Sequence, residues 1–182
     1  PYWYDVNNNK KTWTNKQIVQ RSCGKFRREW ETSSMKEKSY TPENYPILRY
    51  GDVLLMLAEA ENEAHQGPTD LAYECINEIR QRAGISKLEG LSYTDFQQAV
   101  RDERARELCF ESLRKYDLVR WGIYVEAVHD KLGAATQDKR WATGNQFIGA
   151  RDYAARTQEK HQFLPIPTKE LDVNGKLEQN KY

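Results

Sequence analysis

Residues 52–65 read DVLLMLAEAENEAH, and this stretch decides the fold class. Leucine, methionine, alanine and glutamate are strong helix formers, and the first half of the stretch is apolar on nearly every side. Because a helix that is apolar all round has to bury every face, it belongs in the interior of a helical protein. The stretch therefore predicts a central, well-buried helix and a mainly α fold.

A second helix is predicted immediately after the first. Gly67 and Pro68 end the first helix, because glycine favours the position just past a helix and proline cannot continue one. Thr69 or Asp70 can cap the next helix, which ends at Gly84. Apolar residues recur in it at helical spacing: Ala72, Cys75, Ile76, Ile79 and Ala83. The two antiparallel helices are predicted to bury aliphatic side chains between them: Leu54, Leu57, Ala58, Ile76 and Ile79.

Two more helical segments are predicted further along the chain. Thr94 followed by Gln97 has the pattern of a capping box, so a third helix is predicted from there to about Glu111. A fourth helical segment is predicted near residues 116–132, whereas residues 133–162 are polar and are expected to form a loop. Helical pairs of this kind resemble tetratricopeptide packing. The predicted fold is mainly α, with tetratricopeptide-like helical pairs and long irregular loops.

Residues 1–45 lack sustained periodicity and are predicted to form an irregular leader. The sequence has no initiator methionine and no basic segment followed by an apolar stretch, so it contains no signal peptide. We therefore expect a processed or truncated fragment, whose leader continues from a missing N-terminal portion. The predicted organisation is this leader followed by a helical domain at residues 46–182.

The composition argues against several classes of protein. Lysine and arginine number 28 and aspartate and glutamate 27, for a formal net charge of +1, whereas nucleic-acid-binding proteins usually carry a strong basic excess. No apolar run approaches the roughly 18 residues needed to span a bilayer. The three cysteines, Cys23, Cys75 and Cys109, are widely spaced and lack zinc-ligand spacing, so neither a metal site nor a disulfide framework is expected.

The sequence contains none of the common catalytic motifs. It lacks the P-loop, the H-E-x-x-H zinc motif, the G-x-S-x-G nucleophile motif and the dinucleotide-binding glycines. The three histidines, His65, His129 and His161, lie far apart in polar surroundings, where a surface histidine is the simplest interpretation. We expect no enzymatic activity and no cofactor.

Three carboxylates, Glu103, Glu107 and Glu111, recur at four-residue intervals on one face of the third predicted helix. Such a row fits a metal or acid–base site, or an ion-pair network that supports the fold. The second interpretation is favoured, because charge-rich helices are commonly solvated or salt-bridged. The expected partners are nearby arginines: Arg104, Arg114 and Arg120.

Four segments, taken together, resemble the SusD/RagB family. Residues 45–60 (YPILRYGDVLLMLAEA) are similar to the central signature of that family, as are residues 72–83 (AYECINEIRQRA). Residues 103–122 (ERARELCFESLRKYDLVRWG) are similar to its second signature, and residues 164–170 (LPIPTKE) with 179–182 (QNKY) to its usual C-terminus. The segments occur in the family order, and the departures are few: Gly51 where alanine is common, Ser112 where glycine is common, and Lys181 where Pro-Gly is usual.

The resemblance implies the C-terminal part of a helical SusD-like fold and a role in binding rather than catalysis. It implies a cell-surface lipoprotein of the bacterial outer membrane, anchored by a lipid in the missing N-terminal portion. Its partner would be a SusC-like TonB-dependent transporter, with which it captures glycans or other nutrients for uptake. The alternative is a helical-repeat module that binds other proteins and no sugar.

Ligand contact is expected on aromatic residues outside the predicted helices. A sugar ring can stack its C–H face on tryptophan or tyrosine, whose polar tips tolerate partial exposure, while packing in the core is the alternative role of each such residue. Trp121 shares an apolar helical stripe with Leu118 and Val125 and is expected in the core. The candidate ligand-binding residues are Trp3, Tyr4, Trp13, Trp30 and Trp141.

Overall fold

The computed structural model describes residues 2–4, 9–12, 23–26, 31–32, 42–132 and 146–180. In these segments helices predominate, and the strands are two short ones, so the predicted mainly α fold is confirmed. The chain divides into two compact units, each with its own apolar core. Residues 23–114 form one, called here the three-helix unit; residues 1–22 together with 115–182 form the other, called the two-segment unit. The predicted boundary between residues 45 and 46 stays a prediction.

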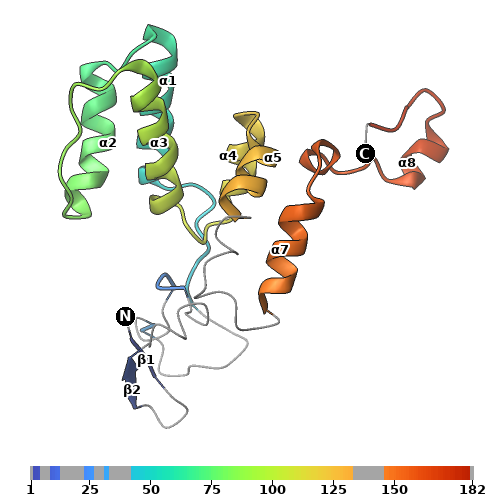
Figure 1. Ribbon diagram of the computed structural model, residues 1–182, viewed down its shortest axis with the longest axis horizontal. Helices are drawn as coiled ribbons and strands as arrows, with labels where there is room; N and C mark the ends of the chain where they lie inside the picture. Colours follow the sequence, from blue (N-terminus) through green and yellow to red (C-terminus); the bar gives the residue numbers. More distant parts are fainter. Residues whose placement is uncertain are drawn as a thin grey trace. The chain divides into compact units, whose positions relative to one another are not determined.

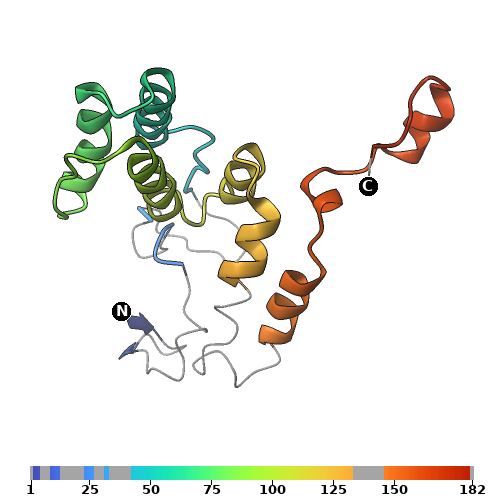
Figure 2. The same cartoon turned by 45° about the horizontal axis from the view of Figure 1, so that its top comes forward.

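The three-helix unit contains α1 (Tyr50–His65), α2 (Asp70–Arg82) and α3 (Tyr93–Glu107). Figures 1 and 2 show the three helices side by side, and α1 packs against both of the others. The turn between α1 and α2 lies where it was predicted. Thr69 caps α2, since its side-chain oxygen accepts a hydrogen bond from the backbone N–H of Ala72 at 3.2 Å.

The core of this unit lies where α1 faces α2 and α3. It is formed by aliphatic and aromatic side chains with one cysteine: Leu54, Leu55, Ala58, Ala72, Cys75, Ile76, Ile79, Phe96 and Val100. Four of the five residues predicted to be buried there are buried. The prediction for Leu57 is wrong, because 37% of this residue is exposed. Leu55 is fully buried in its place. The reason is helical geometry, since Leu57 lies on the side of α1 turned away from Leu55 and Ala58.

The third helix begins earlier than predicted. Its N-cap is Ser92, whose side-chain oxygen accepts from the backbone N–H of Asp95 at 3.2 Å and donates to the Asp95 carboxylate at 2.6 Å. The cap predicted at Thr94 is therefore wrong by two residues. Serine is a preferred N-cap residue because its side-chain oxygen accepts from a backbone N–H of the first turn, and the first residue that does so here is Ser92.

The same helix also ends four residues earlier than predicted. It stops at Glu107, and residues 108–112 form a turn in which Phe110 has φ 64° and Ser112 has φ 61°. Left-handed conformations of this kind end helices because they break the repeating backbone geometry. Glu111 therefore does not extend the helical row of Glu103 and Glu107, contrary to the prediction.

The two-segment unit contains a small hairpin and several short helices. Strands β1 (Tyr2–Tyr4) and β2 (Lys10–Thr12) pair antiparallel within the leader that was predicted to be irregular. The helical elements follow in chain order: α4 (Arg114–Arg120), α5 (Tyr124–Ala127), the π-helix η3 (Val128–Leu132), α7 (Gln146–Arg156), the 3₁₀-helix η4 (Glu159–Gln162) and α8 (Thr168–Val173).

Helix α7 corrects the prediction of a continuous loop over residues 133–162. Its contribution to the core is a small side chain, Ala154, which packs with Leu118, Tyr124 and Val128. A helix that buries mainly alanine has little hydrophobic periodicity, so its pattern resembles that of a polar loop. Trp121, predicted to be core, packs against this cluster but is only half-buried, with the guanidinium of Arg120 4.7 Å from its ring centroid.

The last described residues hold the extended segment around Ile166 in place. The Gln179 side-chain amide accepts from the backbone N–H of Ile166 at 2.9 Å and donates to its carbonyl at 3.0 Å. Asn180 donates to the carbonyl of Leu164 at 2.7 Å. Because Pro165 and Pro167 have no N–H to donate, side-chain amides satisfy the backbone here in place of a neighbouring strand. No helix among the described residues is long and apolar enough to cross a membrane.

Candidate functional site

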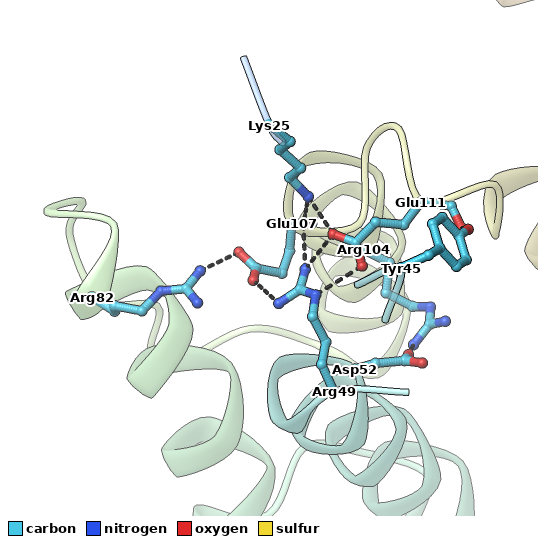
Figure 3. A network of polar contacts seen from close by, with 8 residues as sticks. All are labelled: Lys25, Tyr45, Arg49, Asp52, Arg82, Arg104, Glu107 and Glu111. Atoms are coloured by element: carbon cyan, nitrogen blue, oxygen red, sulfur yellow. Dashed lines mark hydrogen bonds and ion pairs between the residues drawn. The ribbon is translucent and has the colours of Figure 1, made fainter. Parts of the chain in front are cut away.

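A network of cations around two largely buried carboxylates, called here the Arg49 network, lies where α1 begins and α3 ends (Figure 3). The Arg49 guanidinium donates to both carboxylate oxygens of Glu111, at 2.8 and 2.9 Å, and to the Glu107 side chain at 2.5 Å. Lys25 also binds the Glu111 carboxylate, and the hydroxyl of Tyr45 donates to the Glu111 carbonyl at 2.5 Å. Arg82 donates to the other oxygen of Glu107.

The electrostatic setting keeps these carboxylates ionised. Burial acts to raise the pKa of Glu107 and of Glu111, but hydrogen bonds and charges from the cations outweigh it, and both pKa values lie below the ordinary value. For Glu107 the hydrogen bonds come from Arg82 and Arg49, and for Glu111 from Arg49 and Lys25. A carboxylate whose oxygens are all held by cations has no proton to exchange near neutral pH.

The ion-pair network predicted for the three glutamates is present, but with different partners. Glu103 binds Arg80 at 2.8 Å, and Arg49, Arg82 and Lys25 hold the other two. The predicted partners have other contacts. Arg104 forms a buried pair with Asp52 at 2.8 Å, Arg114 donates to the carbonyl of Arg101, and Arg120 pairs with Asp117. Within the described segments, no group of three or more His, Cys, Asp and Glu side chains is placed to hold a metal ion.

The aromatic residues predicted to bind ligand lie mostly outside the described residues. Trp3 and Tyr4 belong to β1, whose backbone is described. Trp13, Trp30 and Trp141 lie outside the described residues. All five stay predictions.

A hollow of about 450 Å³ lies in the two-segment unit and is called here the Tyr153 hollow. Its apolar wall is formed by Tyr124 of α5, Tyr153 of α7 and residues 163–165, which lie just after η4. Charged and polar side chains complete the lining: Lys115, Asp152, Arg156, Thr157 and His161. Aromatic surface combined with a few polar groups in a volume of several hundred Å³ is typical of a small-molecule site.

Two tyrosines are joined at the wall of this hollow. The hydroxyls of Tyr124 and Tyr153 are hydrogen-bonded to each other; Tyr124 is buried, whereas Tyr153 is 49% exposed. Burial, followed by the hydrogen bond with Tyr153, raises the pKa of Tyr124 to about 12. The ammonium group of Lys115 lies 5.3 Å from the centroid of the Tyr124 ring, within cation–π range. Tyr124 is thus a protonated, buried partner for the hydroxyl of exposed Tyr153.

The sequence-based predictions missed this hollow. His161 was interpreted as a solitary surface histidine, and the stretch containing Tyr153 was predicted to be a loop. A helix at residues 146–156 would have placed Asp152, Tyr153 and Arg156 within about one turn of each other. The sequence signal for the hollow is therefore the signal for this helix, namely the helix-forming alanines at positions 150, 154 and 155.

A helical scaffold with internally paired charges and an open aromatic hollow has the features of a binding protein. The sequence model of the SusD family matches residues 2–182, and the chain belongs to this family. It is 40% identical to SusD-like protein P25 of Formosa agariphila over 139 residues, which cover 74% of this chain and 23% of that protein. The family resemblance seen in the sequence is confirmed.

Solved structures of the family agree with this assignment. A SusD homolog from Bacteroides thetaiotaomicron is 37% identical and superposes with a TM-score of 0.67, covering 83% of this chain and 29% of that one. A SusD superfamily protein from Bacteroides vulgatus is 31% identical with a TM-score of 0.54, and the match covers 76% of this chain and 27% of that one. The chain thus spans about a quarter of the length of the relatives it matches.

Proposed function

We propose that the protein is a non-catalytic, glycan- or nutrient-binding component of the bacterial outer-membrane surface. In this role it works with a SusC-like TonB-dependent transporter in the capture and uptake of polysaccharide. The observation that supports the proposal is the family match over residues 2–182. A second support is the Tyr153 hollow, whose size and aromatic wall suit a small ligand.

The absence of catalysis in this proposal is supported by the state of the acidic residues. Glycoside hydrolysis needs two carboxyl groups across a cleft, one of them able to donate a proton. Glu107 and Glu111 are held by arginine and lysine, with pKa values below the ordinary one. A carboxylate held in this way is a poor proton donor.

The proposal is tested by glycan-array binding with the intact protein, followed by titration of the best glycan. Alanine at one or more of Trp3, Trp13 and Trp141 is expected to weaken binding by on the order of thirtyfold and to leave the melting temperature nearly unchanged. Trp121→Ala serves as the matched control, because its half-buried ring packs against the core and its loss should lower stability rather than affinity. Release of reducing ends from the bound glycan would contradict the non-catalytic role.

The transporter partnership needs a separate experiment. Membrane fractionation and affinity purification of the intact protein are expected to recover a TonB-dependent transporter from the outer membrane. Recovery of the protein in another fraction, without such a transporter, would contradict the proposed location and partner.

One observation favours the alternative, a helical module that binds proteins and no sugar. The side of α1 turned away from α2 and α3 carries apolar side chains that are exposed, Val53 at 40% and Met56 at 42%. Exposed apolar helix faces commonly mark protein contacts. Failure of every glycan to bind, together with capture of the transporter, would favour this alternative.

A further inference from the structure

The polar groups around the Tyr153 hollow are mostly hydrogen-bond donors. Lys115 and Arg156 line it, and both side chains donate and cannot accept. His161 accepts at Nδ1 from the backbone N–H of Gln158 at 2.8 Å, so its neutral ring carries a proton on Nε2 and donates there. Among the described residues that line the hollow, Asp152 is the one carboxylate. A ligand that matches this set must be rich in hydrogen-bond acceptors.

The charge of the lining is positive, and its arginine is only loosely paired. Lys115 and Arg156 carry two positive charges against the single negative charge of Asp152. The guanidinium of Arg156 lies 3.9 Å from the Asp152 carboxylate, and its side chain is 82% exposed. An exposed pair at that distance contributes little. The planar fork of the guanidinium therefore remains able to bind an oxyanion in a bidentate manner.

The wall of the hollow provides a complementary apolar surface. The Tyr153 ring is half exposed, and its hydroxyl is held by a hydrogen bond with that of buried Tyr124. Phe163 and Leu164 extend the apolar surface and are 61% and 82% exposed. The volume of about 450 Å³ falls within the range of small-ligand sites. A ligand with one apolar face and one anionic edge suits both parts of the lining.

We propose that the Tyr153 hollow binds an acidic sugar, a pyranose that carries a carboxylate or a sulfate group. The apolar face of the ring stacks against Tyr153, and the anionic group meets Arg156 and Lys115. Asp152 accepts from a ring hydroxyl. This inference rests on the proposed glycan-binding function and deepens it, because it names the class of sugar and the place that holds it.

The direct test is calorimetric titration of the intact protein with three trisaccharides. One is a neutral galactose trimer, one is the corresponding galacturonic acid trimer, and one is a sulfated galactose trimer. At least one acidic trimer is expected to bind about tenfold more tightly than the neutral one, the advantage that a charge-assisted hydrogen bond gives. This advantage should shrink as salt is added, because the groups that carry it are exposed. The two acidic arms distinguish a carboxylate ligand from a sulfate ligand.

Two variants locate the binding site. Arg156→Gln is expected to lower the affinity for the acidic trimer about tenfold and to leave the neutral trimer unaffected. Arg151→Gln is the matched control: it removes the same charge from an exposed position of α7 that does not line the hollow, and its effect should stay within about twofold. Thermal melts of Arg156→Gln and Arg151→Gln confirm that the fold is retained. Lys115→Gln provides a second variant on a different helix.

Equal binding of neutral and acidic trimers would overturn the inference. Acidic-trimer binding that does not respond to Arg156→Gln or Lys115→Gln would overturn it as well, as would failure of both acidic trimers to bind. These failures are distinguishable from failure of the proposed function. After any of them, a neutral glycan found on the array, with binding that depends on Trp3, Trp13 or Trp141, would still preserve the proposed function.

Discussion

The Arg49 network and the Tyr153 hollow are built from the same kinds of side chain, but they leave those side chains in opposite states. In the network, Glu107 and Glu111 are 9% and 5% exposed and each is held by two cations. In the hollow, Arg156 is 82% exposed and its carboxylate partner lies 3.9 Å away. Arginine and carboxylate thus form close pairs around buried acids in one place and a loose, exposed pair in the other.

This difference separates a structural role from a binding role. A buried charge that loses its partner is costly to the fold, so a network of this kind has to stay intact. An exposed and loosely paired charge costs little to redirect, so it can change partners when a ligand arrives. Substitutions in the network are therefore expected to change stability, and substitutions in the hollow to change affinity.

The largest expected effect is at the centre of the network. Arg49→Leu removes four hydrogen bonds and leaves Glu107 and Glu111 with fewer cations while both remain buried. The free energy of unfolding should fall by about 3 kcal/mol, the usual cost of removing one partner of a buried pair. Urea unfolding at neutral pH measures this change.

Arg106→Leu is the control for that substitution. Its pair with Glu103 is 3.6 Å long and its side chain is 62% exposed, so the loss should stay below about 1 kcal/mol. Equal losses for the two variants would mean that burial does not distinguish the network from ordinary surface pairs.

Lowering the pH is expected to have a smaller effect on the free energy of unfolding. The pKa values of Glu107 and Glu111 lie below the ordinary value of 4.5 in the folded protein, so the unfolded chain takes up protons first as the pH falls. Their contribution to stability is therefore complete above pH 4.5 and is lost as the pH falls through the folded values. Urea unfolding between pH 7 and pH 3 should show this decline.

Glu111→Gln identifies the source of the decline. The variant should be less stable than the parent at pH 7, and its stability should depend less steeply on pH below 4.5, because one of the two groups no longer titrates. An unchanged dependence on pH would assign the acid sensitivity to other carboxylates.

The helices of the three-helix unit could be predicted from the sequence because their signals are local. Gly67, Pro68 and Thr69 lie side by side and mark where one helix ends and the next begins. The end of α3 could not be predicted in the same way. Glu111 leaves the helix to reach Arg49, which is 62 residues away in the chain, and no local pattern reports that contact.

The candidate site was harder to predict than the fold. The Tyr153 hollow takes its lining from α4, α5, α7, η4 and the segment that follows, so it exists only after these elements have packed. Helix α7 itself escaped prediction because Ala154, its buried residue, gives a weak hydrophobic signal. The family signatures, in contrast, were recognisable because they are strings of adjacent residues, and they identified the family without locating a binding site.

The smallest expected effect concerns Gly51, which lies in the first turn of α1 beside the Arg49 network. Alanine is more favourable than glycine in a helix by roughly 0.5–1 kcal/mol. A Cβ atom at this position would, however, lie 2.8 Å from Nη1 of Arg49 and 3.1 Å from Oε1 of Glu107. The Arg49 side chain would have to move, although its hydrogen bonds to Glu107 and Glu111 hold it.

The two effects oppose each other, so Gly51→Ala alone should change the free energy of unfolding by less than about 1 kcal/mol. In the Arg49→Leu background the nearer obstacle, Nη1 of Arg49, is absent and Oε1 of Glu107 remains, so the same substitution should be more favourable there, by up to about 0.5–1 kcal/mol. The difference between the two backgrounds is a double-mutant coupling energy, measured by urea unfolding of the four proteins. Equal effects in both backgrounds would mean that Arg49 shifts aside at no cost. The network would then be a looser structure than the hydrogen bonds of Arg49 indicate, and its contrast with the Tyr153 hollow would weaken accordingly.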